Sequence, residues 1–311
     1  MEMLHYDFMQ RAFLAGGIIA LVASVLGVYL MLRRQALMAD MLSHVSLAGV
    51  AAGAYLNVNP TVTGFAVAVI GAVAVEFVRR SYKTYSEISV AIIMIGGLSS
   101  AVVLMNLNKG VTKSFSSYLF GSVVAVNQTE LLLMLGVAAV GGFFFTIFRR
   151  PLYQMTFDEE TAKTNGVPVQ WISLLFSVMT GMIVAAAMPI VGVLLVSSLI
   201  VLPAALAIRI SSSFTSAIVI AMGIGLFGVL SGLTASYELS TPPGGTIALT
   251  LLLILVCGIS VRKLVVKLSK SRNKSNAAKG ISVGSIGVHA RYGHSSSSIH
   301  TTGGNENESM V

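Results

Sequence analysis

An acid and an imidazole lie four residues apart in an apolar stretch near the N-terminus. They are Asp40 and His44, within residues 33–60 (RRQALMADMLSHVSLAGVAAGAYLNVNP). A spacing of four places two side chains on one face of a helix, one turn apart. Imidazole nitrogen suits zinc and other transition metals, whereas carboxylate oxygen suits harder cations such as manganese. The pair could therefore supply half of a tetrahedral metal site, with a second chain, another helix or water completing it.

The depth of this pair in a membrane bears on its role. On a spanning helix, His44 lies roughly 15 Å from Arg34 and about 20 Å from Asn57, close to the middle of a hydrocarbon core about 30 Å thick. A carboxylate one turn away costs a few kcal/mol, so such residues usually serve a function. The alternative is an Asp–His hydrogen bond that only packs the helices. The neighbouring Ser43 and Ser46 are interpreted as helix–helix contacts.

Composition predicts the fold class. Of 311 residues, 55% are hydrophobic and only 10% are charged, whereas soluble proteins carry about 25% charged residues. We therefore predict an all-α, polytopic transmembrane helical bundle of about nine spans. The count falls to eight if one of the two segments that meet around Met188 and Pro189 does not cross. The apolar segments cover residues 12–32, 37–56, 61–78, 88–106, 130–148, 170–188, 190–209, 214–235 and 245–262.

Basic residues predict the orientation. With nine spans, 17 of the 20 Lys and Arg residues fall on one side of the membrane. The positive-inside rule makes that side the cytoplasm, with the N-terminus outside and the C-terminus inside. This rule explains the net charge of +8 better than nucleic acid does, so we expect membrane lipid and no nucleic acid as a partner.

The chain divides by composition into two parts. Residues 1–267 form the predicted transmembrane domain. Residues 268–311 are rich in Ser, Gly, Lys and Asn, which predicts a disordered polar cytoplasmic tail. The phosphate-binding pattern G-x-x-x-x-G-K-[ST] is absent, so energy derived from ATP would have to come from another chain.

Two polar features lie near the predicted cytoplasmic side. Glu76 precedes Arg79 and Arg80 by three and four residues, a spacing that favours a local ion pair. Residues 157–168 (FDEETAKTNGVP) begin with three acids and end with Asn-Gly and Pro. This pattern predicts a short capped helix outside the bilayer, and the alternative is an ordinary solvated connector.

Four stretches resemble a known family. They are LRRQALMADMLSHVSLAGVA around residues 32–51, SYLFGSVVAV at 117–126, DEETAKTNGVPV at 158–169 and VGVLLVSSLIVLPAALA at 191–207. Over residues 10–262 the chain resembles the membrane permease subunit of bacterial zinc/manganese ABC importers. The third stretch also resembles the coupling segment of the wider vitamin B12 and siderophore permeases.

The resemblance implies a homodimer in the bacterial plasma membrane. Its partners would be cytoplasmic ABC ATPases and an extracytoplasmic metal-binding protein. It implies no catalytic site and no bound cofactor, with Zn²⁺ or Mn²⁺ as the transported ion. Asp40 and His44 would line the path and bind that ion. The segment that docks on the ATPase would comprise Asp158, Glu159, Glu160, Ala162, Asn165 and Gly166.

Three questions stay open. The forms MADMLSHVSLAGVA and SYLFGS favour zinc over manganese, although one nitrogen and one oxygen ligand do not separate the two metals. A secondary transporter or channel that works without ATP is the alternative function. An intramembrane serine protease is disfavoured, because His44 is the only histidine in the predicted spans and Ser43 and Ser46 are poorly placed for it.

Overall fold

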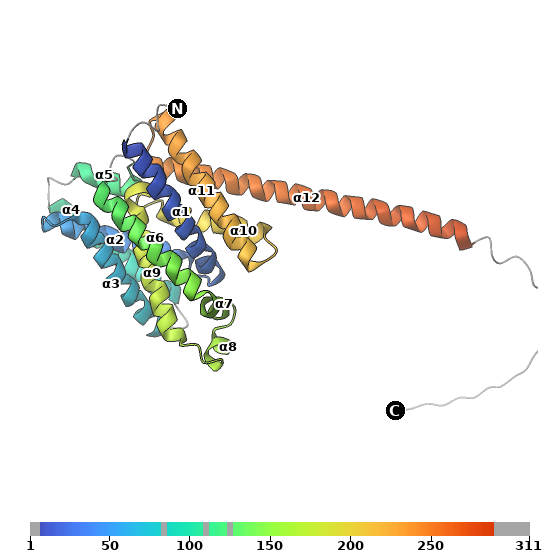
Figure 1. The fold of residues 1–311 in the computed structure, drawn as a ribbon, viewed down its shortest axis with the longest axis horizontal. Helices are drawn as coiled ribbons and strands as arrows, with labels where there is room; N and C mark the ends of the chain where they lie inside the picture. The colour runs from blue at the N-terminus through green and yellow to red at the C-terminus, as the bar shows by residue number, and fades with distance from the viewer. Residues whose placement is uncertain (1–6, 82–85, 108–111, 123–126, 289–311) are drawn as a thin grey trace, which may run out of the picture. The chain divides into compact units, whose positions relative to one another are not determined.

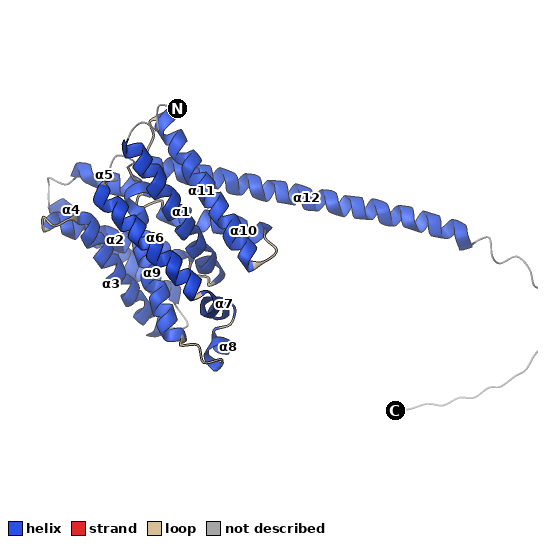
Figure 2. Ribbon diagram, viewed as in Figure 1, coloured by secondary structure: helices blue, strands red, loops and turns tan. Residues whose placement is uncertain are grey.

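The structure is a computed structural model that describes residues 7–81, 86–107, 112–122 and 127–288. These residues form helices and connecting turns, with no strand among them (Figures 1 and 2). The all-α prediction is therefore confirmed. The helices are α1 (Asp7–Leu32), α2 (Ala36–Tyr55), α3 (Pro60–Ser81), α4 (Ser86–Leu107), α5 (Thr112–Phe120), α6 (Gln128–Ile147), α7 (Arg149–Phe157), α8 (Glu159–Thr164), α9 (Val169–Val191), α10 (Val196–Ile210), α11 (Phe214–Leu239) and α12 (Pro243–Val288).

Eight of the described helices are long and apolar enough to cross a membrane: α1, α2, α3, α4, α6, α9, α11 and the part of α12 up to Leu264. They correspond to eight of the nine predicted segments. The ninth, residues 190–209, contains the shorter apolar helix α10, of 15 residues. At 1.5 Å per residue α10 extends about 22 Å, less than the roughly 30 Å of the hydrocarbon core.

The chain breaks between α9 and α10, just after Pro189 of the last turn of α9. Gly192 has φ +82°, a left-handed conformation that favours glycine. A Cβ there would lie 2.4 Å from the carbonyl oxygen of Leu119, beside α5. The amide of Val193 donates to the carbonyl of Tyr118 (2.9 Å), and the amide of Ser122 donates to the carbonyl of Pro189 (3.0 Å). The end of α5 thus supplies backbone partners that the interrupted helix lacks.

After this break, α10 returns along α1. Val28 of α1 belongs to one buried cluster with Ala204 and Ala207 of α10, and Leu32 and Ile208 pack against that cluster. The last turn of α10 therefore lies near the end of α1. The two predicted segments that meet around Met188 and Pro189 are thus a long helix, α9, and a shorter helix, α10, that runs back.

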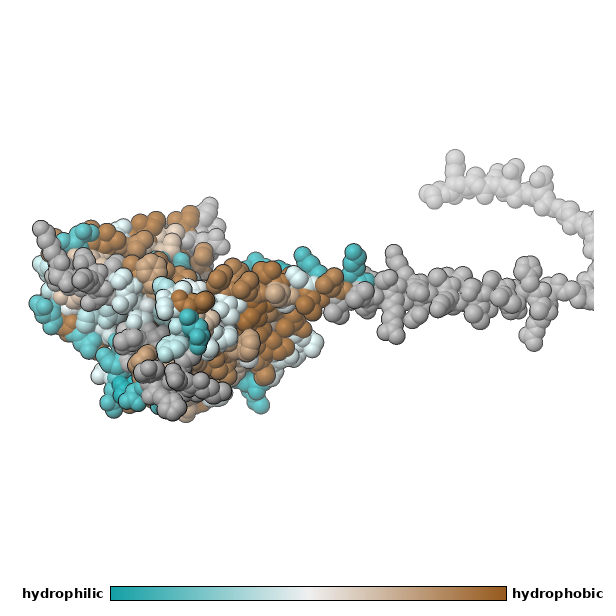
Figure 3. Space-filling view, turned by 90° about the horizontal axis from the view of Figure 1, so that it is seen from above, coloured by the Kyte–Doolittle hydropathy of each residue, from teal (hydrophilic) through white to brown (hydrophobic). Residues whose placement is uncertain are grey.

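Three helices make up most of the centre of the bundle. α1, α2 and α9 are buried over most of their length, whereas α4 and the apolar part of α12 are mostly exposed. The largest cluster of buried side chains includes Tyr29, Phe145 and Phe176, and the rings of Tyr29 and Phe145 stack with their centroids 5.6 Å apart. Contiguous hydrophobic patches remain on the visible surface (Figure 3), as expected for a protein whose outer helices contact lipid.

Basic residues gather at one end of the bundle, which we call the basic end. It comprises the turn after α1, the end of α3, helices α7 and α8, and the last turn of α10. Arg149 of α7 reaches Thr215 in the first turn of α11 at 3.0 Å. Lys83 lies outside the described residues. The basic end consists of Arg33, Arg34, Arg79, Arg80, Arg149, Arg150, Lys163 and Arg209.

The chain separates into two compact units, residues 1–260 and 261–311, and the site described below lies in the first. In the second, α12 continues as a helix to Val288. Residues 289–311 lie outside the described residues. The division at residue 267 and the disorder of residues 268–311 stay predictions.

Candidate functional site

Asp40 and His44 lie on α2, which packs mainly against α3 and α4 and also touches α9 and α10. Helix α4 approaches closely beside His44: a Cβ on Gly97 would lie 3.0 Å from the amide nitrogen of Val45. His44 is buried, with 9% of its surface exposed, and Asp40 is half-buried. The imidazole of His44 is thus enclosed by the helix bundle, whereas the carboxylate of Asp40 is partly exposed.

No hydrogen bond joins these two side chains in the described part of the chain. The Nδ1 atom of His44 is buried and has no hydrogen-bond partner there. Burying a polar atom without a partner costs free energy. A ligand that bound Nδ1 would remove that cost. The alternative interpretation, an Asp–His hydrogen bond that only packs helices, is not the arrangement found.

The two flanking serines behave differently. Ser46 donates from Oγ to the carbonyl of Gly64 on α3 (3.1 Å), which is the predicted helix–helix contact. Ser43 donates within its own helix, to the carbonyl of Asp40 (2.7 Å). Among the described residues, no group of three or more His, Cys, Asp and Glu side chains could hold a metal ion. Within the described residues, Asp40 and His44 are therefore not part of a larger group of such side chains, and their role as metal ligands stays a prediction.

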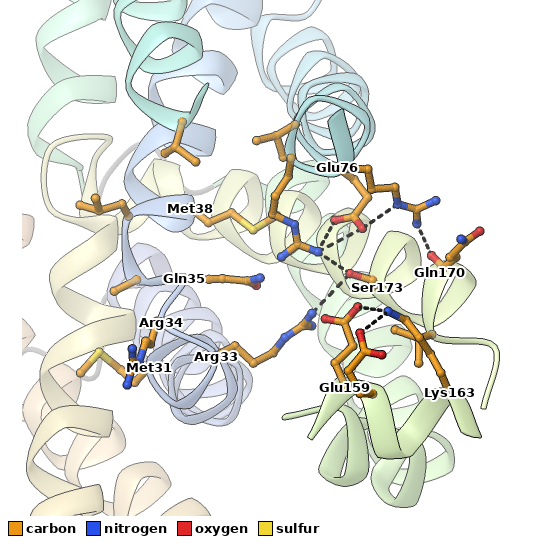
Figure 4. Close-up of a pocket in the computed structure, with 18 residues that line it drawn as sticks. Met31, Arg33, Arg34, Gln35, Met38, Glu76, Glu159, Lys163, Gln170 and Ser173 are labelled. Carbon is orange, nitrogen blue, oxygen red and sulfur yellow. Dashed lines mark hydrogen bonds and ion pairs between the residues drawn. The ribbon is translucent and has the colours of Figure 1, made fainter. Parts of the chain in front are cut away.

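A cavity of about 980 Å³ opens at the basic end. Asp40 and His44 are not among its lining residues. Its walls come from the turn before α2, the end of α3, helix α8 and the start of α9 (Figure 4). The polar and charged lining residues are Arg33, Arg34, Gln35, Glu76, Arg79, Arg80, Glu159, Glu160, Lys163, Gln170 and Ser173.

Glu76 is the centre of an ion-pair network on one wall of this cavity. Its buried carboxylate pairs with Arg79 at 2.9 Å and with Arg80 at 3.2 Å, which confirms the predicted local ion pair. The structure adds partners from α9, because Ser177 donates to Glu76 (2.9 Å) and Arg79 donates to Ser173 (2.6 Å). The signal for these serines in the sequence is weak, since it consists of two hydroxyls four residues apart on an apolar helix.

Arg33 connects this network to the start of α2. One end of its guanidinium, Nη2, donates to Ser173 (3.3 Å), and its Cζ lies 4.8 Å from the ring centroid of Phe176. The other end, Nη1, is buried and has no partner among the residues that the structure describes, and the same holds for Oε1 of Gln35. Burial and the nearby charge of Arg79 lower the pKa of Arg33 to about 10, opposed by Glu76 and Glu159. Arg33 therefore stays charged at neutral pH.

Residues 158–166 form the predicted short capped helix. Asp158 is the N-cap of α8 and accepts from the amide of Thr161 (3.0 Å) and from its hydroxyl. These hydrogen bonds lower the pKa of Asp158 below its ordinary value. Gly166, with φ +80°, follows the helix and donates to the carbonyl of Lys163.

Most of α8 faces outward. Ala162 is fully buried and anchors it, while Glu160 is 90% exposed. Lys163 pairs with Glu159 and with Glu160, each at 3.3 Å, and these carboxylates raise its pKa. A small exposed helix with one buried anchor suits docking to another protein, a role that stays a prediction.

These features define a class: a multi-pass membrane protein whose polar groups lie inside the bundle and at one end. The sequence matches the ABC 3 transport family over residues 5–262, and the chain belongs to that family. It is a permease subunit of an ABC transporter in the cell membrane, a transport component and not an enzyme. The resemblance drawn from the four sequence stretches is confirmed.

Relatives of known description support this assignment. A probable metal transport system membrane protein of Treponema pallidum is 33% identical over 263 residues, which cover 84% of this chain and 98% of the relative. The high-affinity zinc uptake system membrane protein ZnuB of Haemophilus influenzae is 29% identical, covering 80% of this chain and 97% of the relative. The manganese transport system membrane protein MntC of Halalkalibacterium halodurans is 28% identical, covering 80% and 85%.

A solved structure shares the fold. It is described as PsaBC from Streptococcus pneumoniae in complex with Fab. The match has a TM-score of 0.74 and 26% identity, and covers 83% of this chain and 92% of that chain.

Proposed function

We propose that this chain is the permease of an ABC importer that carries a divalent transition metal into the cytoplasm. The observation that carries the proposal is the buried His44, whose Nδ1 has no partner, one turn from the half-buried Asp40. A divalent cation would bind the imidazole nitrogen and the carboxylate oxygen and so give the orphaned atom a partner. The membrane proteins ZnuB and MntC, named for zinc and manganese, support this class of cargo.

Zinc is the favoured cargo over manganese. The forms MADMLSHVSLAGVA and SYLFGS favour zinc, while relatives named for each metal match over similar lengths. Side-by-side transport of the two ions is therefore the decisive measurement. The site must release the ion as well as bind it, so an incomplete ligand set suits a path better than a closed structural site does.

A homodimer would complete the ligand set. Two copies of Asp40 and His44 would supply two oxygen and two nitrogen ligands, enough for tetrahedral coordination. The absence of a third ligand among the described residues of one chain supports this arrangement. The half-buried state of Asp40 in the single chain leaves room for a partner at that position.

The basic end would face the cytoplasm, with the N-terminus outside and nine passes in all, α10 making a short return pass. The gathering of basic residues at one end supports this orientation. The chain carries no recognisable phosphate loop, so separate ATPase subunits would supply the energy. They would dock on Asp158, Glu159, Glu160, Ala162, Asn165 and Gly166, and an extracytoplasmic metal-binding protein would deliver the ion to the other face.

Uptake into vesicles that hold the reconstituted complex of permease and ATPase tests the proposal. We expect ATP-dependent uptake of zinc, with manganese compared in parallel, and loss of uptake in Asp40→Asn and His44→Ala. Ser43→Ala is the matched control, because that hydroxyl only bonds its own helix backbone. Wild-type uptake in both ligand variants would refute the proposal, and uptake that survives ATP depletion would support a secondary transporter instead.

A further inference from the structure

The cavity at the basic end is lined by charged side chains of both signs. Arg33 and Arg34 lie in the turn that leads into α2, and Glu159 lies on α8 (Figure 4). Glu160 of α8 also lines the cavity. Nη1 of Arg33 is buried and has no hydrogen-bond partner within the described part of the chain. A buried guanidinium with one free end is an arrangement that favours a carboxylate partner.

Glu159 is the carboxylate that best fits this need. Burial is the largest cause of the lowered pKa of Arg33, and the charges of Glu76 and, less strongly, Glu159 oppose it. In the described conformation, Glu159 pairs instead with Lys163 at 3.3 Å, and no ion pair joins it to Arg33. The side chain of Glu159 is 53% exposed, whereas that of Glu160 is 90% exposed and faces away from the bundle more completely.

We propose that Glu159 and Arg33 form an ion pair in a second state of the transport cycle, and that this pair carries a movement of α8 to α2. The proposal rests on the function proposed above, in which α8 docks on the ATPase and α2 carries the metal ligands. It assigns a positioning role to Arg33, which would act on the metal path through α2 without touching the ion.

The connection between Arg33 and the metal ligands is short and stiff. Only Arg33, Arg34 and Gln35 separate α1 from α2. Arg34 has φ +57°, a left-handed conformation that is uncommon for a residue with a side chain. The carbonyl of Gln35 accepts a hydrogen bond from the amide of Met38 in the first turn of α2 (3.0 Å), which ties this turn to the helix. A pull on Arg33 would therefore move the first turn of α2, and Asp40 lies about one turn further along that helix.

Helix α8 is attached in a way that permits such movement. It contacts α7 and the start of α9 and few other parts of the bundle. Its anchors are the buried Ala162 and the hydrogen bond from the amide of Val167 to the carbonyl of Ala162 (3.1 Å). In the second state, Nη1 of Arg33, which has no partner among the described residues, would bind Glu159, and Glu159 would leave Lys163. Two arrangements with different partners are what a two-state coupling element needs.

Charge exchange in the reconstituted complex tests the pair. We expect Arg33→Glu and Glu159→Arg each to lower ATP-driven zinc uptake about tenfold, and the double exchange to recover uptake to within about threefold of wild type. Glu160→Arg is the matched control: it makes the same charge change in the same docking helix, but Arg33→Glu should not rescue it. Equal rescue of both, or of neither, would overturn the pair.

A cross-link keeps the test decisive if the charge variants do not fold. The chain has one cysteine, Cys257, so Arg33→Cys with Glu159→Cys is built on Cys257→Ser. We expect a disulfide in one of two states, nucleotide-free or vanadate-trapped, and uptake that returns on reduction. No disulfide in either state, or one equally strong with Glu160→Cys, would overturn the inference. Absence of zinc and manganese uptake by the wild-type complex would instead refute the proposed function.

Discussion

Helices α2 and α8 differ in whether their polar side chains have partners within the protein. On α2, His44 is buried in a largely apolar helix and Nδ1 has no partner. On α8, the charged side chains have partners within the helix. Asp158 accepts a hydrogen bond from the amide of Thr161, and Lys163 pairs with Glu159 and Glu160. A buried polar group without a partner lowers stability, whereas a solvated helix with local partners does not. The contrast matches the roles proposed for the two helices, binding of an ion by α2 and docking by α8.

Substitutions on α2 should separate transport from stability most strongly. We expect His44→Leu to reduce metal uptake by about a hundredfold or more, while the free energy of unfolding changes by less than about 1.5 kcal/mol, because no protein partner is orphaned. Uptake and thermal unfolding of the same purified complex check this. A large loss of stability would show that His44 has a structural role and would erase the contrast with α8.

Glu76 sharpens the contrast, because it is a buried polar group with a full set of partners. Glu76→Gln would leave Arg79 and Arg80 without their carboxylate, and we expect a loss of about 2–3 kcal/mol, less than for a fully buried pair because both arginines are partly exposed. Thermal unfolding in detergent measures it. Arg150→Gln, on the exposed part of α7, is the matched change of one charge, and an equal loss there would contradict the explanation.

Asp158 provides the smallest expected effect. Asp158→Ala removes the N-cap of α8, so we expect faster amide exchange in residues 159–164 and a few-fold loss of ATP-driven uptake, with the bundle intact. Because hydrogen bonds from Thr161 lower the pKa of Asp158, its contribution is present above the ordinary aspartate pKa and is lost as pH falls through the lowered value. Exchange in α8 that is unchanged by the substitution would contradict the capping role.

Much of the fold and part of the site were predictable because they depend on neighbours in the chain. The eight long helices follow from runs of apolar residues. The pair of segments whose number of crossings is open in the sequence meets around Pro189, and the chain breaks just after this residue. The ion pair of Glu76 with Arg79 and Arg80 follows from helical spacing. The caps of α8 follow from Asp158 and Gly166. Hydropathy, helical periodicity and capping act over a few residues, so sequence alone reveals them.

Contacts between distant segments needed the tertiary structure. Ser173 and Ser177 of α9 join Glu76 and Arg79 across more than ninety residues of sequence. The end of α5 supplies the partners at the break after Pro189, and Arg33 lines a cavity together with residues of α8. By itself the sequence determined which helices form and that Asp40 and His44 share a face. Only packing decided that His44 is buried without a partner, because burial and hydrogen bonding depend on which helices meet.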